Sequence, residues 1–371
     1  IRLASAAAPA ALRQPVAAVC LWRATASNPM RPIEIHPDIC SAETLPSWCY
    51  RDQDFFALCR DHIIARSWQI VPVEAPAEPG AAPFPFLKGC LDEPLLLTTD
   101  ALGKRHCVSN VCTHRGTVLT ECKAEKLRCP YHGRRFGLDG SFRSMPGFED
   151  ALDFPRPEDD LKRLPMHDLG PFRLTSLDPS RPFEEIFSPL AGLFSADLKL
   201  DPAGSRAYHV QANWLLYLEN FLEGFHIPFV HPALQSALGD APYEIELYAA
   251  ASAQVARDAA GGRGARARYC FAFPNLMFNF YPWGLSLNIA VPISVNETRV
   301  EFQKWVADPA ALADELSGDL DLIQREDEQV VEGMQRGMQS RLYHRGRYAP
   351  RHELAVHHFH SLIAAAAASS S

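Results

Sequence analysis

The stretch that decides the fold runs from residue 112 to residue 133 and reads CTHRGTVLTECKAEKLRCPYHG. It contains two matched pairs of a cysteine and a histidine, with 14 residues between the pairs: Cys112-x-His114 and Cys129-x-x-His132. A glycine follows each pair closely, as a tight loop requires. Two thiolates and two imidazoles presented in this way predict a metal centre.

Two kinds of metal centre use such ligands. Four nitrogen and sulfur ligands in close pairs usually hold zinc, and a structural zinc site is one interpretation. The other is a Rieske 2Fe–2S cluster, in which two cysteines hold one iron and two histidines hold the other. The loops CTHRG and CPYHG closely resemble those of Rieske proteins. This resemblance favours the cluster and implies that its ligands are Cys112, His114, Cys129 and His132.

The type of Rieske protein follows from two further positions. Rieske proteins of respiratory complexes carry an extra cysteine in each loop, and the corresponding residues here are Thr117 and Tyr131. The cluster therefore resembles the low-potential type found in oxygenases. Cys107 and Cys122 lie nearby without the context of the motif and are interpreted as ordinary thiols.

Composition excludes several classes of protein. Apolar residues make up 47% of the 371 residues and charged residues 22%, which is typical of a globular protein with a real core. The net charge of −8 argues against binding to nucleic acid. No apolar run reaches the ~18 residues of a membrane span. The ten cysteines are scattered along the chain, which predicts reduced thiols in place of a disulfide framework.

Five segments are expected along the chain. The first contains three arginines, many alanines and no acid, which is typical of a transit peptide. Such a segment would imply a chloroplast or mitochondrion, whereas a bacterial source would imply the cytoplasm. The expected segments are 1–29, disordered or transit-like; 30–66, a helical part that packs on the catalytic domain; 67–180, the Rieske domain; 181–362, the catalytic domain; and 363–371, a disordered tail.

Local patterns predict the main elements. Short runs rich in β-branched residues predict strands at 68–74, 94–100 and 105–110, and residues 267–306 predict three or so antiparallel strands. Apolar periodicity predicts helices at 51–66, at 212–226 with its end at Pro228, and at 309–340. The HHFH run at 357–360 is interpreted as part of a surface helix.

A second metal site is predicted in the stretch ENFLEGFHIPFVH, residues 219–231. Glu223 and His226 are three residues apart, so they would share one face of a helix. His231 follows Pro228 and can fold back toward them. Two histidines are two thirds of the 2-His-1-carboxylate set that holds non-haem iron with open positions for oxygen. A pair of histidines five residues apart also arises by chance, so the pattern alone is weak.

A wider resemblance strengthens the prediction of an iron site, because residues 45–345 resemble the α subunits of Rieske non-haem iron oxygenases. The resemblance implies an α+β fold: a small antiparallel β Rieske domain, and a helix-grip-like catalytic domain with an antiparallel sheet flanked by helices. It also implies that the carboxylate ligand lies in QREDEQVVEGMQRGMQS, residues 324–340, at Asp327, with the neighbouring Glu326 as the rival.

Glu223 has a role in the family as well. The resemblance implies that it joins an iron histidine to a Rieske histidine of the neighbouring subunit and orients both. Most aromatic-ring dioxygenases have aspartate there, whereas glutamate resembles the branch acting on quaternary ammonium compounds. The sequence departs from the family at Leu215, where many members have lysine, and at Arg134, where many have tryptophan. Arg134 is expected to alter the surface that docks the electron donor.

The resemblance also implies cofactors and partners. These are a 2Fe–2S cluster, a mononuclear Fe(II), dioxygen and a small substrate. The chain has no G-x-G-x-x-G motif for a nucleotide, so NAD(P)H would act through a separate ferredoxin or flavin reductase. Members are commonly trimers, so a homo-oligomer is expected.

The substrate is the open question. Aromatic residues in the expected strands would form a cage for a trimethylammonium group by cation–π attraction, or a pocket for a flat aromatic ring, or plain sheet core. They are Phe271, Phe273, Phe278, Phe280 and Trp283. The expected function is hydroxylation or N-demethylation of a quaternary ammonium compound such as choline, betaine or carnitine. The alternatives are an aromatic-ring-hydroxylating dioxygenase or aromatic-acid monooxygenase, and a non-catalytic Rieske electron-transfer protein.

Overall fold

The structure is a computed structural model that describes residues 31–232, 235, 243–257, 265–314 and 320–369. The segment 1–29, interpreted above as transit-like, lies outside the described residues. Residues 33–371 form one compact unit. Within the described ranges, no helix combines the length and the apolar character needed to cross a membrane.

The cysteine–histidine pairs lie in a region built from short antiparallel strands. A four-stranded sheet has the order β2-β3-β4-β8, and a three-stranded sheet has the order β5-β6-β7. Their bounds are β2 (Gly80–Phe86), β3 (Glu93–Thr99), β4 (Arg105–Ser109), β5 (Leu127–Arg128), β6 (Arg135–Phe136), β7 (Phe142–Ser144) and β8 (Arg163–Leu164), with a short 3-10 turn η3 (Pro157–Asp159) before β8.

Alternation along these strands builds the core of this region. Leu96 on β3 pairs in register with Val108 on β4, and both are fully buried, which contributes roughly 1.5–3 kcal/mol per side chain. A further three-stranded sheet, β1-β10-β9, contains β1 (Gln69–Ile70), β9 (Met166–Leu169) and β10 (Phe172–Thr175). A strand was predicted over 68–74, but β1 covers only Gln69–Ile70. It ends early because Pro72 has no N–H group to donate to a neighbouring strand.

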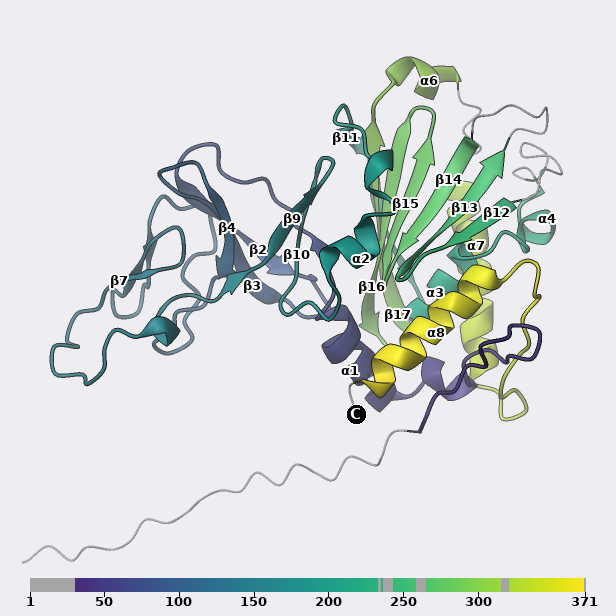
Figure 1. Ribbon diagram of the computed structural model, residues 1–371, viewed down its shortest axis with the longest axis horizontal. Coiled ribbons are helices and arrows are strands. Elements are labelled where there is room, and N and C mark those ends of the chain that lie inside the picture. Colours follow the sequence, from purple (N-terminus) through teal and green to yellow (C-terminus); the bar gives the residue numbers. More distant parts are fainter. Residues whose placement is uncertain (1–30, 233–234, 236–242, 258–264, 315–319, 370–371) are drawn as a thin grey trace, which may run out of the picture. The chain divides into compact units, whose positions relative to one another are not determined.

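The larger part of the chain is built on a seven-stranded antiparallel sheet with the order β11-β17-β16-β15-β14-β13-β12 (Figure 1). Residues 267–306, expected to give about three strands, supply most of four. The strands are β11 (Lys199–Val210), β12 (Tyr243–Leu247), β13 (Ala251–Arg257), β14 (Ala265–Ala272), β15 (Leu276–Tyr281), β16 (Gly284–Ser294) and β17 (Glu297–Val306).

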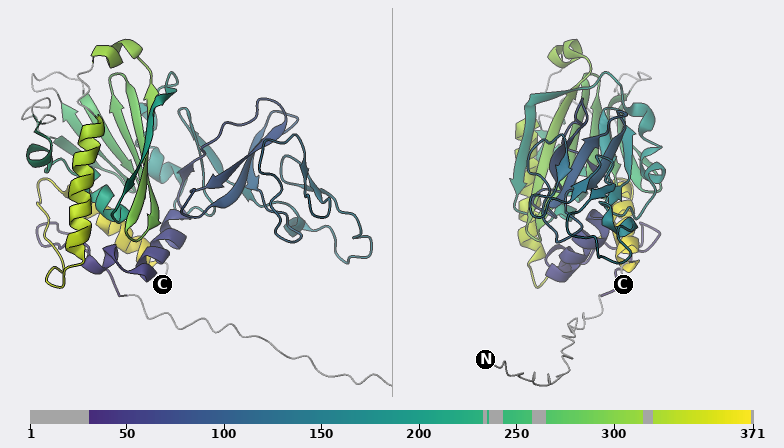
Figure 2. Two further views of the ribbon diagram at one scale, coloured as in Figure 1. Left: turned by 180° about the vertical axis from the view of Figure 1, so that it is seen from behind. Right: turned by 90° about the vertical axis from the view of Figure 1, so that its left-hand side faces the viewer.

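Three helices cover one face of this sheet: α3 (Trp214–Phe221), α7 (Leu320–Met338) and α8 (Leu354–Ala368) (Figures 1 and 2). Gln254 on β13 donates to the carbonyl of Phe221 at 2.8 Å, and the rings of Phe271 on β14 and Phe359 on α8 are 5.5 Å apart. These contacts define the helix-covered face. The other described elements here are α2 (Phe183–Phe187), η4 (Ala191–Leu193), α4 (Ile227–Val230) and α6 (Pro309–Asp314). An antiparallel sheet flanked by helices, beside a small antiparallel β region, confirms the predicted fold class.

The N-terminal described segment packs against the helices that cover the sheet. It contains η1 (Ser47–Tyr50), α1 (Gln53–Leu58) and a π-helical turn η2 (Cys59–Ile64). Asp52 caps α1 by accepting from the N–H groups of Asp54 and Phe55. Arg345, beyond α7, donates to the carbonyl of Thr44 at 2.7 Å. Hydrogen bonds and helix packing thus connect this segment to the part of the chain that follows α7.

Three local expectations were wrong. The helix predicted over 212–226 ends at Phe221, and a new short helix begins at Ile227, because Pro228 fits the first turn of a helix and not its interior. The tail expected to be disordered from residue 363 stays helical to Ala368, since alanine has the highest helix propensity. The HHFH run is not on a surface helix, because His360 is completely buried.

Candidate metal centres

The two cysteine–histidine loops have the same backbone geometry. The N–H of Cys112 donates to the carbonyl of Thr117 at 2.8 Å, and the N–H of Cys129 donates to the carbonyl of Arg134 at 2.7 Å. Each bond spans five residues, so each loop closes on itself in the same way. The sequence places the loops after β4 and β5, and the fold presents them as equivalent structures.

A glycine closes each loop. Gly116 donates to the carbonyl of Cys112 and Gly133 to the carbonyl of Cys129, both at 3.0 Å. Their φ angles are +72° and +73°, in the left-handed region that glycine adopts without steric cost. The glycine after each pair is therefore required by the loop, as the sequence indicated.

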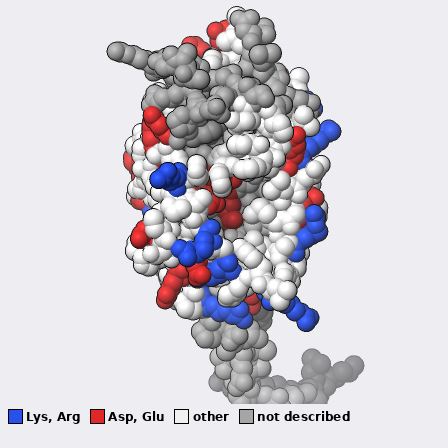
Figure 3. Space-filling view, turned by 90° about the vertical axis from the view of Figure 1, so that its right-hand side faces the viewer, with Lys and Arg blue, Asp and Glu red and all other residues white. Residues whose placement is uncertain are grey.

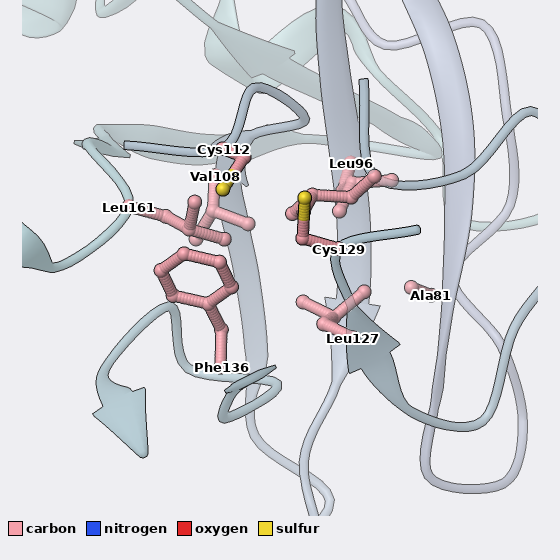
Figure 4. Packing of buried hydrophobic residues seen from close by; sticks show 9 residues of the cluster. Ala81, Leu96, Val108, Cys112, Leu127, Cys129, Phe136 and Leu161 are labelled. Atoms are coloured by element: carbon pink, nitrogen blue, oxygen red, sulfur yellow. The ribbon is translucent and has the colours of Figure 1, made fainter. Parts of the chain in front are cut away.

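The four side chains separate into a buried sulfur pair and a more accessible histidine pair. Figure 4 shows Cys112 beside Val108 and Cys129 above Leu127, within one cluster of buried residues that also contains Phe136. The rings of His114 and His132 lie 4.9 Å apart between centroids. Two buried thiols and two neighbouring imidazoles on matched loops fit the ligand set of a Rieske cluster.

Local electrostatics differ between the two thiols, because burial raises the pKa of the Cys112 thiol whereas that of Cys129 is lowered. Burial raises the pKa of the Cys129 thiol, but the backbone N–H groups of His132 and Tyr131 oppose this effect and lower it. Such N–H groups stabilise a metal-bound thiolate. Burial and the neighbouring His132 lower the pKa of His114, which favours the neutral imidazole that binds metal.

The second candidate centre lies where α4 meets α7. His226 and His231 flank α4, one before its first residue and the other after its last, and Asp327 lies on α7. The Oδ1 of Asp327 is 3.5 Å from Nε2 of His226 and 2.9 Å from Nε2 of His231. One ligand atom from each of the three residues lies within 4.8 Å of the others. Two imidazoles and one carboxylate are the donors of a mononuclear non-haem iron.

Each histidine has a second carboxylate on its other ring nitrogen. His226 donates from Nδ1 to Glu223 at 2.6 Å, and His231 donates from Nδ1 to Glu326 at 2.7 Å. The Nε2 atoms are therefore oriented toward Asp327, with the tautomer fixed from behind. Figure 3 turns the α4 side of Figure 1 toward the viewer and shows acidic side chains in a hollow between uncharged atoms.

These carboxylates shift the pKa values of the site. Burial lowers the pKa of His226, but hydrogen bonds with Asp327 and Glu223 outweigh burial and raise it to about 9. Burial raises the pKa of Asp327, but the two histidines outweigh burial and hold it below its usual value. The site concentrates negative charge around two imidazoles, which favours a bound cation.

The helices that carry this centre are held by buried polar bonds. The hydroxyl of Tyr217 on α3 donates to Gln324 on α7 at 3.0 Å, and the N–H of Asn213 donates to Gln335 on α7 at 3.0 Å. All four residues are buried. These two pairings could not be predicted from the sequence, because the partners are 107 and 122 residues apart along the chain.

The predicted cage residues do not share one environment. Phe271 and Phe273 contact Phe359 of α8, on the helix-covered face. Phe278 and Phe280 contact Phe194 beyond η4, and alternation along β15 and β14 places them on the opposite face. Trp283 lies in the turn after β15, stacked on Tyr281. The five aromatic residues therefore do not line one pocket in this structure.

Both departures from the family pattern are buried. Leu215 is 1% exposed on α3, and Arg134 is 1% exposed, with its guanidinium near the rings of Phe136, Phe142 and Phe154. Arg134 is therefore not part of a docking surface, contrary to the expectation from sequence.

Comparisons with known proteins agree with both centres. Residues 68–158 match the family described as Rieske [2Fe-2S] domain, and residues 198–369 match the family described as Ring hydroxylating alpha subunit (catalytic domain). These two matches define an iron-dependent oxygenase. The zinc interpretation and the interpretation as a non-catalytic Rieske electron-transfer protein are therefore wrong.

Individual relatives narrow the family further. The chain is 30% identical over 352 residues to choline monooxygenase, chloroplastic, of Arabidopsis thaliana, covering 87% of this chain and 82% of that protein. It is 30% identical over 203 residues to the glycine betaine monooxygenase oxygenase subunit of Pseudomonas aeruginosa, covering 53% of this chain and 46% of that protein.

Solved structures share the fold. The quaternary ammonium Rieske monooxygenase CntA in complex with L-carnitine superposes with a TM-score of 0.69 at 23% identity, over 90% of this chain and 99% of that chain. Naphthalene 1,2-dioxygenase with indole bound superposes with a TM-score of 0.62 at 17% identity, over 89% of this chain and 93% of that chain. The chain belongs to the Rieske non-haem iron oxygenases and resembles their quaternary ammonium monooxygenases. It is an oxidoreductase of the family that uses a Rieske 2Fe–2S cluster and a mononuclear iron with a separate electron donor.

Proposed function

We propose that this enzyme is a monooxygenase that hydroxylates or N-demethylates a small quaternary ammonium compound such as choline, glycine betaine or carnitine. The observation that carries the proposal is the similarity to choline monooxygenase over most of both chains. Glu223 supports it, because the bridging acid is a glutamate, as in the quaternary ammonium branch. Electrons come from NAD(P)H through a ferredoxin or flavin reductase.

Within this proposal, Cys112, His114, Cys129 and His132 hold the cluster. His226, His231 and Asp327 hold the mononuclear iron. The position of Glu326 supports Asp327 as the ligand, because Glu326 accepts from Nδ1 of His231, whereas Asp327 is near Nε2 of both histidines. A carboxylate behind a ligating histidine orients the ring and does not bind the metal.

The protein side chains have separable tasks. Glu223 and Glu326 accept from Nδ1 of His226 and His231, so with iron bound each Nε2 would present its lone pair to the metal. Asp327 would complete the set of three protein ligands, and such a set would leave iron positions open for dioxygen. When bound, the two iron centres supply the electrons that activate dioxygen. Glu223 is the residue proposed to reach a Rieske histidine of a neighbouring subunit in a homotrimer.

The test is a substrate panel read by oxygen uptake. The enzyme reconstituted with iron, a surrogate reductase and NADH should consume oxygen with choline, glycine betaine or carnitine. Formation of an aldehyde or a demethylated amine should match the oxygen consumed. The Asp327→Ala variant provides the background rate. Uptake with benzoate or naphthalene and none with the ammonium compounds would contradict the proposal and favour the aromatic-ring alternative.

We also propose import into a plastid. The acid-free, alanine-rich and arginine-containing composition of residues 1–29 supports it, and so does the plant relative whose name includes the word chloroplastic. Residues 1–29 fused to a fluorescent protein should direct it to chloroplasts in leaf cells. Diffuse cytosolic fluorescence would contradict this proposal.

A further inference from the structure

Arg134 is a buried cation beside the cysteine–histidine loops. It follows the glycine that closes the second loop, and its side chain is 1% exposed. Burying a charge costs free energy unless the charge is paired, so a buried arginine requires a specific partner. Its position two residues after His132 makes its charge relevant to whatever that loop holds.

Asp159 is the ionic partner of Arg134. One guanidinium nitrogen of Arg134, Nη2, donates to Oδ1 of Asp159 at 2.6 Å and to its backbone carbonyl at 3.3 Å. The Nε–H of Arg134 is buried and has no acceptor among the described residues. One carboxylate thus satisfies only part of the guanidinium.

Three phenyl rings surround the same guanidinium and exclude water. Its central carbon lies 5.6 Å from the ring centroid of Phe136, 4.9 Å from that of Phe142 and 5.5 Å from that of Phe154. Each distance falls within the range of a cation–π contact. A charge enclosed in this way is screened much less than a charge on the surface.

The ion pair also connects the two cluster loops. The backbone carbonyl of Arg134 accepts from the N–H of Cys129, in the second loop. The backbone carbonyl of Asp159 accepts from Oγ1 of Thr113, between the two ligands of the first loop, at 2.8 Å. Arg134 and Asp159 therefore contact both loops and each other.

We propose that Arg134 and Asp159 set the reduction potential of the Rieske cluster with opposite signs. Reduction adds one electron to the cluster, so the buried cation of Arg134 favours the reduced form and the partly exposed anion of Asp159 disfavours it. Net charge around an iron–sulfur cluster is one of the factors that fix its potential. The arginine keeps its proton throughout, so only the electron moves. The proposal rests on the cluster ligands proposed above.

The test is a redox titration of the purified protein, followed by the visible and EPR signals of the cluster. Arg134→Gln should make the cluster harder to reduce, by about tenfold in the reduced-to-oxidised ratio at a fixed ambient potential, or about 59 mV for one electron. Asp159→Asn should shift the potential in the opposite direction, and Arg134→Lys should stay close to the parent. Arg135→Gln removes a neighbouring exposed charge and should shift the potential little.

The direction of the potential shift in each variant distinguishes an electrostatic role of Arg134 and Asp159 from a purely structural one. If loosened loops and water entry were the only effect, Arg134→Gln and Asp159→Asn would shift the potential in the same direction, and that result would overturn the proposal. If Arg134→Gln fails to load a cluster, the comparison of Asp159→Asn with the parent and with Arg135→Gln still decides. An unchanged potential in Asp159→Asn with a normal cluster signal would also overturn it. An unchanged Rieske signal after His132→Ala would instead contradict the proposed ligands, independently of the two charges.

Discussion

His226 shows how a single side chain is fixed from two sides. One ring nitrogen is bound to Glu223, and the other is 3.5 Å from Asp327. The residue types and their spacing were readable from sequence. The partner on α7 was not readable from spacing alone, because it lies about a hundred residues away and adjoins a second acid. Only the fold places Asp327 and Glu326 on different nitrogens of His231.

The two neighbouring acids should therefore respond differently to substitution. Asp327→Ala should remove the mononuclear iron and abolish turnover while leaving the Rieske visible spectrum intact, so that iron content falls from three to two atoms per chain. Glu326→Gln should retain that iron with about 10–100-fold weaker affinity, because it loses only the bond behind His231. Metal analysis after dialysis against a chelator measures both. The opposite ranking would assign the ligand to Glu326.

Glu223→Gln tests the bridging role. It keeps the size of the side chain but replaces a charged acceptor with a weaker, neutral one. Both metals should bind and dithionite should still reduce the cluster, whereas reoxidation of the cluster with substrate and oxygen should slow by roughly 10–100-fold. Stopped-flow absorbance in a single turnover measures the rate. Normal reoxidation with full product yield would show that Glu223 does not connect the centres.

A second buried histidine has a structural role. His360 donates from Nε2 to Glu219 at 3.0 Å and accepts at Nδ1 from the hydroxyl of Tyr348 at 2.7 Å. Glu219 also accepts from Tyr50 at 2.7 Å. These bonds join α3, α8 and the N-terminal segment. The HHFH run was read as surface because its histidines are polar, and only the distant Glu219 makes the burial of one of them favourable.

His360→Leu should therefore destabilise the protein by about 2–4 kcal/mol, because it leaves a buried carboxylate and a buried hydroxyl with lost partners. Urea unfolding of the metal-loaded protein measures the change. His357→Leu is the matched control on the same helix, since the one side-chain hydrogen bond of His357 within the described residues goes to the carbonyl of His36, although its ring also contacts Tyr348. The His357→Leu variant should lose less than about 1 kcal/mol of unfolding free energy. Equal losses for the two variants would mean that the buried network adds nothing.

At the scale of elements, strands were easier to predict than the ends of helices. A high content of β-branched and aromatic residues predicted about three antiparallel strands over 267–306, where the structure has most of four. The end of α3 was predicted five residues too late, since the apolar periodicity continues through the turn. Glu223 consequently lies beyond the helix, and it contacts His226 through a turn and not along a helix face.

Replacing either of two glycines by alanine should change the free energy of unfolding, and the two changes should have opposite signs. Gly284 begins β16 with a φ of +151°, and an added Cβ would lie 2.2 Å from the carbonyl oxygen of Trp305. Gly284→Ala should cost about 3 kcal/mol or more, because the strained backbone and the clash both disrupt the pairing of β16 with β17. Thermal unfolding of the holo protein provides the comparison with the parent.

Gly337 is the control, near the end of α7, where an added Cβ meets nothing within 4 Å. Gly337→Ala should stabilise by roughly 0.5–1 kcal/mol through helix propensity. A destabilisation by Gly337→Ala as large as that by Gly284→Ala would show that the close approach between β16 and β17 is not the cause.

At the scale of the whole molecule, a large aromatic residue lies exposed beside the mononuclear site. Phe229 on α4 is 78% exposed, between His226 and His231 in sequence. Exposed apolar residues near a functional site are typical of surfaces that contact another chain. Since Glu223 is proposed to reach a neighbouring subunit, this surface is expected to lie in the subunit interface.

Phe229→Arg should therefore weaken assembly, with the parent eluting as a trimer and the variant shifting toward smaller species at low micromolar concentration. Light scattering after size-exclusion chromatography measures the mass. Leu102→Arg, at an exposed turn between β3 and β4, is the control and should leave the mass unchanged. A parent that elutes as a monomer would contradict the expectation outright.

The packing of residues 33–66 has a consequence for recombination between relatives. This segment precedes the Rieske region in the chain, yet Arg345 binds the carbonyl of Thr44 and Tyr50 binds Glu219 of α3. A chimaera made by a single crossover after the Rieske region would join one parent's Tyr50 to another parent's α3 and α8. Two crossovers, one on each side of the Rieske region, keep those partners together. Gene exchange that inserts the electron-carrying part as a cassette should therefore yield folded enzymes more often than exchange of contiguous halves.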